Sequence, residues 1–331
     1  MQDAAGEVEL RDEEGGIRSD FLHAVIQALE AGDAAKAREL ALPLHAADLA
    51  DLIELLRPEQ RGELIAMLGA DFDAAALAEL DESVRDQVLE TMPPEQVAAA
   101  LQKLDSDEAV YVIEDLDKEE QSDILAKLPP FERAQLERSL EYPEDSAGRI
   151  MQTDLIAVPP FWSVGQAIDY MRVADDLPDR FYEIFVVDPA YHLIGSVALN
   201  RLLRSKRPVT IEAITDRDIH PIPVDADQEE VARQFERYNL TSAPVVDNDG
   251  RLVGVITADD VVEVMQEEAS EDILKMGGVG GESVSDSVWR RTRHRFTWLF
   301  ANLITAILAS AVISLFEATI EQMVALAVLM P

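Results

Sequence analysis

Carboxylate side chains recur on one face of a helix that the sequence predicts from about Asp259. Asp260, Glu263, Glu267 and Glu271 follow one another at spacings of three and four residues, which places them on the same helical face. Hard divalent cations prefer oxygen ligands and are bound through one or two carboxylates per ion. The pattern therefore predicts either a cation-binding face or a solvated acidic face, and the second is the more common of the two.

The overall charge favours a cationic ligand over an anionic one. The 331 residues carry a formal net charge of −37, and residues 1–275 hold 24 Lys and Arg against 61 Asp and Glu, whereas residues 276–331 hold four of each class. Such a charge repels phosphate backbones, so we expect no nucleic acid partner. A solvated, salt-tolerant surface has the same composition, so the charge alone does not decide the function.

The sequence contains no motif that is typical of catalysis. It has no cysteine, which excludes disulfides, thiolate zinc sites and thiol nucleophiles, and its five histidines are scattered without ligand spacing. It also has no phosphate-binding loop, nucleophile-base pair or metal-hydrolase motif. We therefore expect a protein that is not an enzyme.

The first part of the chain is predicted to be helical. Apolar residues recur at helical spacing from about Asp20 to Leu140, in short segments separated by helix breakers. Two of these segments are alike, namely Val88-Leu-Glu-Thr-Met-Pro93-Pro94 and Ile124-Leu-Ala-Lys-Leu-Pro129-Pro130. Stacked helix pairs of this kind predict a superhelical or right-angle array.

A second region contains a duplicated strand-turn-strand pattern. Residues 185–197 and 244–256 repeat this pattern 59 residues apart, and Asp-Asn-Asp-Gly at 247–250 favours a tight hairpin. We predict strands at 184–187 and 193–197 and again at 243–246 and 252–256. Helices are predicted at 163–171, from 200, at 227–235 and from 258. The region therefore reads as two copies of one α+β unit.

The last part of the chain carries a membrane signal. Residues 296–316 contain no charge and are long enough to cross a hydrocarbon layer of roughly 30 Å as a helix. Four arginines at 290, 291, 293 and 295 precede this segment, so the positive-inside rule places residues 1–295 in the cytoplasm. Residues 322–331 resemble the start of a second span. The residues before Gly16 contain no apolar stretch, so we expect no signal peptide. We expect an inner-membrane or plasma-membrane protein.

The two α+β units resemble the CBS (cystathionine-β-synthase type) fold, whose tandem pairs form a pseudo-symmetric disc that regulates other domains by binding a ligand. The order of acidic helical domain, CBS pair, acidic helix and membrane span resembles the MgtE family of magnesium channels and transporters. Local runs are similar as well: Ala147-Gly148-Arg-Ile-Met151, Asp225-Ala-Asp-Gln-Glu-Glu-Val-Ala-Arg233, Gly250-Arg-Leu-Val-Gly254 and Ala269-Ser-Glu-Asp-Ile-Leu-Lys-Met-Gly277.

This resemblance implies a homodimeric membrane channel whose cytosolic domains bind Mg²⁺ and close the pore when the ion is plentiful. The family's conducting domain has further transmembrane helices beyond Pro331. The expected parts are an all-α N domain at 20–141, a CBS pair at 142–258 (units at about 150–206 and 214–265), a connecting or plug helix at 259–276, a linker with a basic segment at 277–295, a first transmembrane helix at 296–316 and the start of a second at 322–331.

The resemblance also implies a set of metal ligands. In the CBS pair and the helix after it, the matching positions are Asp227, Glu229, Asp260, Glu268, Glu271 and Asp272. Asp227 to Glu230 also has the form of a helix capping box, in which Glu230 is the capping partner and Glu229 is the freer ligand. Asn239 stands where the family has an aspartate, which predicts a weaker site. In the helical domain only Asp107 is retained, because Ala75 and Tyr111 replace the other expected acids.

A second ligand is predicted from a run that CBS domains use for adenosine. Gly254-Val-Ile-Thr257-Ala-Asp-Asp260 fits the pattern in which a hydroxyl and a carboxylate hold the ribose, whereas Gly195-Ser-Val-Ala198-Leu-Asn-Arg201 does not. Thr257 and Asp260 are thus candidate ligands for ATP or another adenine nucleotide, and Thr257 as a simple helix cap is about as good an interpretation. Two further functions stay open, namely a nucleotide-sensing CBS regulator of another transporter and a membrane-tethered acidic adaptor.

Overall fold

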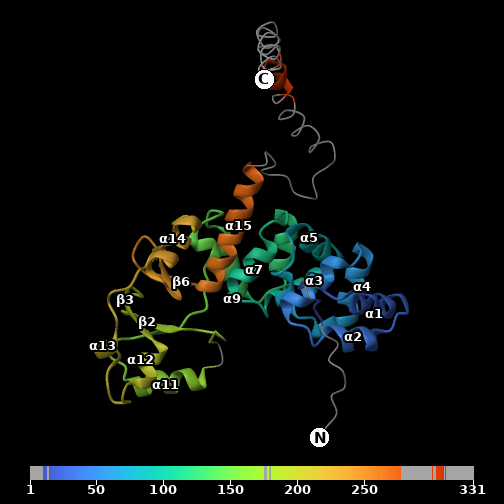
Figure 1. Cartoon of the computed structure of the whole chain (residues 1–331). Coiled ribbons are helices and arrows are strands. Elements are labelled where there is room, and N and C mark those ends of the chain that lie inside the picture. Colours follow the sequence, from blue (N-terminus) through green and yellow to red (C-terminus); the bar gives the residue numbers. More distant parts are fainter. Residues whose placement is uncertain are drawn as a thin grey trace, which may run out of the picture. The chain divides into compact units, whose positions relative to one another are not determined.

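The computed structural model describes residues 10–12, 15–174, 177–178, 180–276, 300, 303–308 and 310. The chain forms two compact units, Met1–Met265 and Gln266–Pro331. The first unit contains a helical domain (α1 to α9) and two small α+β repeat units that follow it (Figure 1). This arrangement confirms the predicted helical N-terminal domain and CBS-like pair.

The helical domain has an unexpectedly regular period. Its elements are α1 (Ser19–Glu30), α2 (Ala34–Ala41), α3 (Ala46–Leu55), α4 (Pro58–Leu68), η1 (Gly69–Asp71), η2 (Ala74–Leu77), α5 (Glu82–Thr91), α6 (Pro94–Leu101), α7 (Ser106–Ile113), α8 (Lys118–Leu125) and α9 (Pro130–Leu140). From α2 onward the α-helices begin 12 residues apart, except that α4 and α5 begin 24 apart with η1 between them. Each step is one short helix and a tight connection, so the domain is built from stacked helical hairpins.

The period arises from the same residue positions in successive helices. The fourth residue of every α-helix from α2 to α7 is buried, and Leu49, Val97 and Ala109 fill the core at this position. Arg61 takes the same position in α4 and donates through Nε to the carbonyl oxygens of Ile53 and Leu56, both at 3.1 Å. The Ile53 carbonyl also accepts from the Leu56 N–H at 3.2 Å, so the buried arginine is an added donor at the C-terminal end of α3. Charged residues at core positions hide the period from a search for apolar residues.

The two repeat units share one topology. In the first, α10 (Ala147–Ile150) leads into β1 (Ala157–Val158), α11 (Val164–Val173), β2 (Glu183–Val187), β3 (Leu193–Ala198) and α12 (Leu199–Arg204); in the second, α13 (Ile211–Ile214) leads into β4 (Ile222–Pro223), α14 (Gln228–Tyr238), β5 (Ser242–Val246), β6 (Leu252–Thr257) and α15 (Ala258–Met276). The sheets run β1-β2-β3 and β4-β5-β6, each with one parallel and one antiparallel pairing. The predicted strands agree with the observed ones to within one residue at each end.

Residues in equivalent positions of the two units meet each other. The Ser242 hydroxyl donates to the Glu183 carboxylate at 2.8 Å, and these two residues are 59 positions apart, which is the spacing of the sequence repeat. His192 and Arg251, again 59 apart, form a β-bridge where the two hairpins meet. The duplicated units therefore pair around a pseudo-twofold axis, as the sequence repeat indicates.

The connection between the helical domain and the repeat units is closely packed. The N–H groups of Ala147 and Gly148 donate to the carbonyl oxygens of Ala226 and Val224, at 2.7 and 2.8 Å. A Cβ atom on Gly148 would lie 2.6 Å from the Tyr142 ring, so only glycine fits there. Residues 145–153 are thus held against the second repeat unit by backbone hydrogen bonds.

Among the described residues, no helix is both long enough and apolar enough to cross a membrane. The predicted linker at 277–295 and second span at 322–331 lie outside the described residues, as does most of the predicted span at 296–316.

Candidate functional site

Two of the predicted metal ligands come together where the helical domain meets the second repeat unit. Asp107 lies in the first turn of α7, Asp260 lies in the first turn of α15, and their carboxyl groups interact directly. The side-chain nitrogen of Gln152 lies between them, 3.5 Å from Asp107 Oδ2 and 3.3 Å from Asp260 Oδ1. Asp107 Oδ1 is buried and has no hydrogen-bond partner in the part of the chain that the structure describes. Three elements distant in sequence therefore build one acidic site.

Negative charge accumulates at this site. Burial, followed by the charges of Asp260 and Glu108, raises the pKa of Asp107 well above its ordinary value. Burial also raises the pKa of Asp260, although hydrogen bonds from Thr257 oppose the shift. Glu263 keeps an exposed side chain, yet partial loss of hydration and the nearby carboxylates raise its pKa to about 7. At a site of this kind, carboxyl groups that bind a proton or a metal cation are favoured over ionised carboxylates without a partner.

Thr257, at the start of α15, donates hydrogen bonds to carboxylates in the first turn of that helix. The backbone N–H of Thr257 donates to Asp260 Oδ2 at 2.7 Å, and its hydroxyl donates to the same oxygen at 2.9 Å. The hydroxyl also bonds Asp259. These contacts form a cap at the start of α15, and they hold the Asp260 carboxylate beside α7. Thr257 itself is buried.

The other predicted ligands in the second unit lie apart from this site. Asp227 caps α14 by accepting from the Glu229 N–H at 3.0 Å, as predicted. Glu229, which we expect to be the freer ligand, pairs with Arg233 at 2.8 Å. Glu230 was predicted to complete the capping box and instead pairs with Arg233 at 3.0 Å. Arg233 lies one turn further along the helix, at i+3 and i+4, and attracts both carboxylates.

Asn239 has a backbone role. It ends α14 in the left-handed conformation with φ of 51°, which Asn tolerates better than most residues. Its side chain is exposed. The remaining candidates, Glu268, Glu271 and Asp272, belong to the later turns of α15, beyond Met265. The side chains of Glu271 and Asp272 lie outside the described residues.

The described residues do not include a ready-made metal cage. No group of three or more His, Asp or Glu side chains among them is placed to hold one metal ion. Mg²⁺ keeps several of its waters and uses one or two carboxylates, so a pair of acids meets its requirements. The orphaned oxygen of Asp107 and the adjacent Asp260 carboxylate fit a hydrated ion of this kind.

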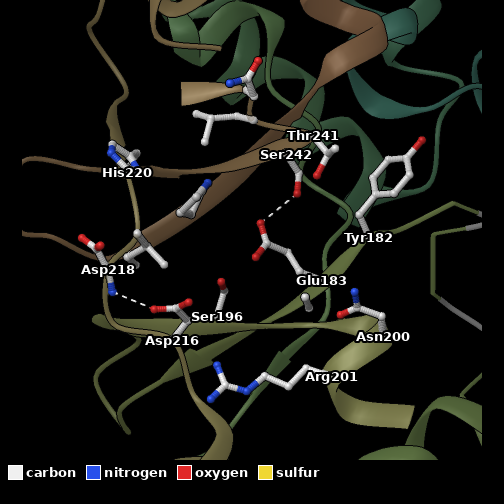
Figure 2. A pocket seen from close by; sticks show the side chains of 15 residues that line it. Tyr182, Glu183, Ser196, Asn200, Arg201, Asp216, Asp218, His220, Thr241 and Ser242 are labelled. Carbon is white, nitrogen blue, oxygen red and sulfur yellow. Dashed lines mark hydrogen bonds between the residues drawn. The ribbon is translucent and has the colours of Figure 1, made fainter. Parts of the chain in front are cut away.

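A separate pocket lies between the two repeat units. Its volume is about 330 Å³, and it contains neither Thr257 nor Asp260. Figure 2 shows Tyr182, Arg201, His220 and Thr241 around it, contributed by different segments. The His220 ring lines the pocket and lies tilted by 32° against the ring of Tyr238, with centroids 4.1 Å apart. The pocket therefore combines a cationic side chain, aromatic rings and hydroxyl groups.

Comparison with known proteins agrees with both parts of the fold. Residues 44–145 match the model of the MgtE intracellular N domain, and residues 147–207 and 211–267 match the CBS domain model. The crystal structure of the cytosolic domain of the Mg²⁺ channel MgtE in complex with ATP is 31% identical, with a TM-score of 0.67, over 73% of this chain and 99% of that one. The chain belongs to the MgtE family.

Other relatives of known name support membership of the MgtE family. The magnesium transporter MgtE of Thermus thermophilus is 34% identical over 205 residues, which are 60% of this chain and 45% of that protein. The MgtE of Bacillus subtilis is 29% identical over a similar share. The crystal structure of the soluble part of a magnesium transporter covers 76% of this chain and 98% of that one at 26% identity, with a TM-score of 0.67. The chain thus spans less than half the length of the curated MgtE proteins that it matches.

Two features of this MgtE family member were missed in the sequence. Gln152 belongs to no motif, and it becomes visible as a site residue only because it contacts Asp107 and Asp260, which are 45 and 108 residues away in sequence. The open pocket lies beside Ala198 and Arg201, in the run that does not fit the adenosine pattern. Its hydroxyl groups come from Ser196, Thr241 and Ser242 instead, and no linear pattern joins these residues.

Proposed function

We propose that this chain is the cation-sensing part of a magnesium transport protein. In this proposal Mg²⁺ binds between Asp107 and Asp260 and stabilises the docking of the helical domain on the second CBS unit. The observation that carries it is the buried, unpartnered oxygen of Asp107 beside a second carboxylate from the other domain. The magnesium transporters among the relatives support the choice of ion.

Calorimetric titration of the 331-residue chain with Mg²⁺ tests this proposal. We expect the double variant Asp107→Asn, Asp260→Asn to lose at least about tenfold in Mg²⁺ affinity, because two ligand charges are removed while the side-chain size is kept. Asp249→Asn, at an exposed hairpin turn, is the matched control and should bind as the unchanged protein does. Equal affinity in the double variant would contradict the proposal. Na⁺ at equal ionic strength controls for screening.

The transport function of the whole protein is part of the same proposal. Residues 296–316 serve as a membrane span, residues 1–295 lie on the cytoplasmic side, and α15 with the linker after it connects the sensor to the pore. Glu268, Glu271 and Asp272 add acidic ligands along this connection. The measurement is Mg²⁺ uptake by cells that produce the full-length protein, and uptake that is unaffected by the Asp107 and Asp260 changes would contradict the coupling.

A homodimer is proposed as the working assembly. Its support is an apolar pair on equivalent helices of the two CBS units, Leu203 on α12 and Val262 on α15, which are 66% and 51% exposed and 59 positions apart. Val173 and Tyr238 are exposed in the same units. Light scattering should give twice the chain mass for the purified protein and the single mass for Leu203→Asp. Leu55→Asp, on an exposed site of the helical domain, is the control.

The pocket favours an adenine nucleotide as a second ligand. In this proposal the His220 ring, which lies against Tyr238, faces the base, and Arg201 offers charge to the phosphates. A solved MgtE cytosolic domain contains ATP, which supports the ligand class. Titration with ATP should show about tenfold weaker binding for Arg201→Ala, and unchanged binding for Arg204→Ala one turn further along α12. If Thr257→Ala instead abolishes binding, the nucleotide lies at the run that the sequence predicted.

A further inference from the structure

Gln152 holds an unusual position in the acidic site. A single amide nitrogen is shared between two carboxylates from different domains, at 3.3 and 3.5 Å. Ordinary N–H···O bonds measure about 2.7–3.2 Å, so both contacts are long and weak. The amide supplies hydrogen-bond donors at the place where two negative charges meet, but it brings no positive charge. A small hydrated cation at this place would contact the same two carboxylates.

The backbone of Gln152 is fixed on both sides. Its N–H donates to the Val255 carbonyl at 2.8 Å, and its carbonyl accepts from the Val255 N–H at 2.9 Å. The next residue, Thr153, donates its N–H to the Ser106 hydroxyl at 2.7 Å. The main chain is therefore bonded to β6 and to the first residue of α7. Only the side-chain torsions of Gln152 are free to change when an ion arrives.

A second contact holds the other end of α7 without any metal. Arg149 lies 3.2 Å from Glu114, which follows the last residue of α7, and it also donates to the Tyr142 carbonyl at 2.7 Å. The Arg149 side chain is 11% exposed and that of Glu114 is 21% exposed, so water screens this ion pair only in part. Arg149 and Thr153 thus keep α7 beside the second unit, and Asp107 stays near Asp260 in the absence of an ion.

We propose that Gln152 limits the affinity of the cation site: its amide occupies the space between Asp107 and Asp260 in the ion-free protein and is displaced when a divalent cation binds. This inference rests on the proposed Mg²⁺ site. The amide bonds with each carboxylate must break before the ion can bridge the two acids, so Gln152 competes with the ion and weakens its binding. It also limits the repulsion between the carboxylates in the ion-free state.

Removing the amide tests this role. We expect Gln152→Ala to bind Mg²⁺ about three- to tenfold more tightly in calorimetry of the 331-residue chain, the factor by which one ordinary hydrogen bond shifts an equilibrium. Gln152→Asn is a second variant in case the first does not fold; its shorter amide cannot reach both carboxylates, so it should shift affinity in the same direction by less. Gln135→Ala is the matched control, because Gln135 bonds Thr153 in the same interface and does not contact either acid.

The opposite result would overturn the inference. If Gln152→Ala and Gln152→Asn bind Mg²⁺ more weakly than the unchanged protein or equally well, the side chain is a ligand or a bystander. If the unchanged protein itself does not bind Mg²⁺, the proposed function fails, and this result is distinct from the first. A second readout is amide hydrogen exchange of α7. Gln152→Ala should exchange faster than the unchanged protein in EDTA, and the difference should vanish in saturating Mg²⁺.

Discussion

The two CBS units have the same backbone topology, but the residues at the end of their last strands have different neighbours. After its last strand the first unit has Ala198, Asn200 and Arg201, which line an open pocket. The second unit has Thr257, Asp259 and Asp260 at the positions 59 residues later, where the hydroxyl and carboxylates bond one another and face the acidic end of α7. Three side-chain differences therefore separate an open pocket from a surface on which another domain docks.

The two units also differ in charge in the helix that follows the last strand. Arg204 in α12 and Glu263 in α15 occupy equivalent positions, again 59 residues apart. Glu263 adds to the negative field that already includes Asp260, Glu79 and Glu108. An interface between two acidic surfaces is unfavourable unless a proton, a cation or a neutral donor intervenes. The second unit thus presents acidic groups to the helical domain, whereas the first unit has a basic residue at the position equivalent to Glu263.

The largest difference between the units is expected at their equivalent glycines. A Cβ atom on Gly195 would overlap the backbone carbonyl of Asp216, which is itself fixed by two bonds to Ser196. On Gly254 it would lie 2.5 Å from Met151 Sδ, which belongs to a flexible side chain, and 2.9 Å from the Gln152 carbonyl oxygen, a longer backbone contact than the 2.1 Å at Gly195. We expect Gly195→Ala to lower the free energy of unfolding by about 3 kcal/mol and Gly254→Ala by about 1–2 kcal/mol, as for overpacked cores. Urea denaturation of both variants measures the difference.

The same pair of variants separates the two sites. Asp216 and its neighbours line the pocket proposed for the nucleotide, so Gly195→Ala should weaken ATP binding more than Mg²⁺ binding. Met151 precedes Gln152, so Gly254→Ala should affect Mg²⁺ binding more. Equal effects of both changes on both ligands would show that the two units do not act separately.

A smaller effect is expected from pH. The pKa values of Asp107, Asp260 and Glu263 are raised in the folded protein, so the folded state holds these protons more tightly than the unfolded state does. The stability that they contribute is therefore greatest at low pH and is lost as pH rises from about 4.5 toward 7, the value for Glu263. In EDTA we expect the free energy of unfolding to fall over this range.

Substitution at the equivalent positions isolates this effect. Glu263→Gln should reduce the loss of stability between pH 5 and 7 by about 1 kcal/mol, less than for a fully buried acid because the side chain still contacts water. Arg204→Gln in the first unit should leave the pH dependence unchanged. Saturating Mg²⁺ should remove most of the slope in the unchanged protein. A slope that persists in Mg²⁺ would mean that protons and the ion do not share the site.

How much of this structure the sequence predicts depends on the range of the interactions. The four long strands follow from alternating residues and hairpin turns, which are local signals, whereas β1 and β4 have two residues each and are too short to show alternation. The 12-residue helical period was not predicted, because Arg61 and Arg85 occupy core positions where an apolar residue is expected. Asp107 and Asp260 were predicted one at a time, and nothing in the sequence placed them together.

The local hydrogen bonds around the predicted ligands show the same limit. Asp227 was correctly expected to cap α14, because a cap depends only on neighbouring residues. The partner of Glu229 and Glu230 was not foreseen, although Arg233 lies within one helical turn, because several local pairings compete for the same carboxylates. Gln152 is the extreme case. Its position follows only from how the helical domain docks on the second unit.

The smallest expected effects concern the caps that begin α12 and α15. At the start of α15 the Thr257 hydroxyl donates to the Asp260 carboxylate, so Thr257→Ala should cost about 1 kcal/mol, and Thr257→Ser should cost much less because the hydroxyl is kept. Ala198 takes the same place before α12, in an extended conformation with φ −58° and ψ 139°, and offers no cap. Ala198→Thr should therefore stabilise the first unit by about 0.5 kcal/mol. Urea midpoints measure both changes. If Ala198→Thr gives no gain while Thr257→Ala is costly, the cap in the second unit acts mainly by positioning Asp260 for docking, since a purely local cap would work equally in either unit.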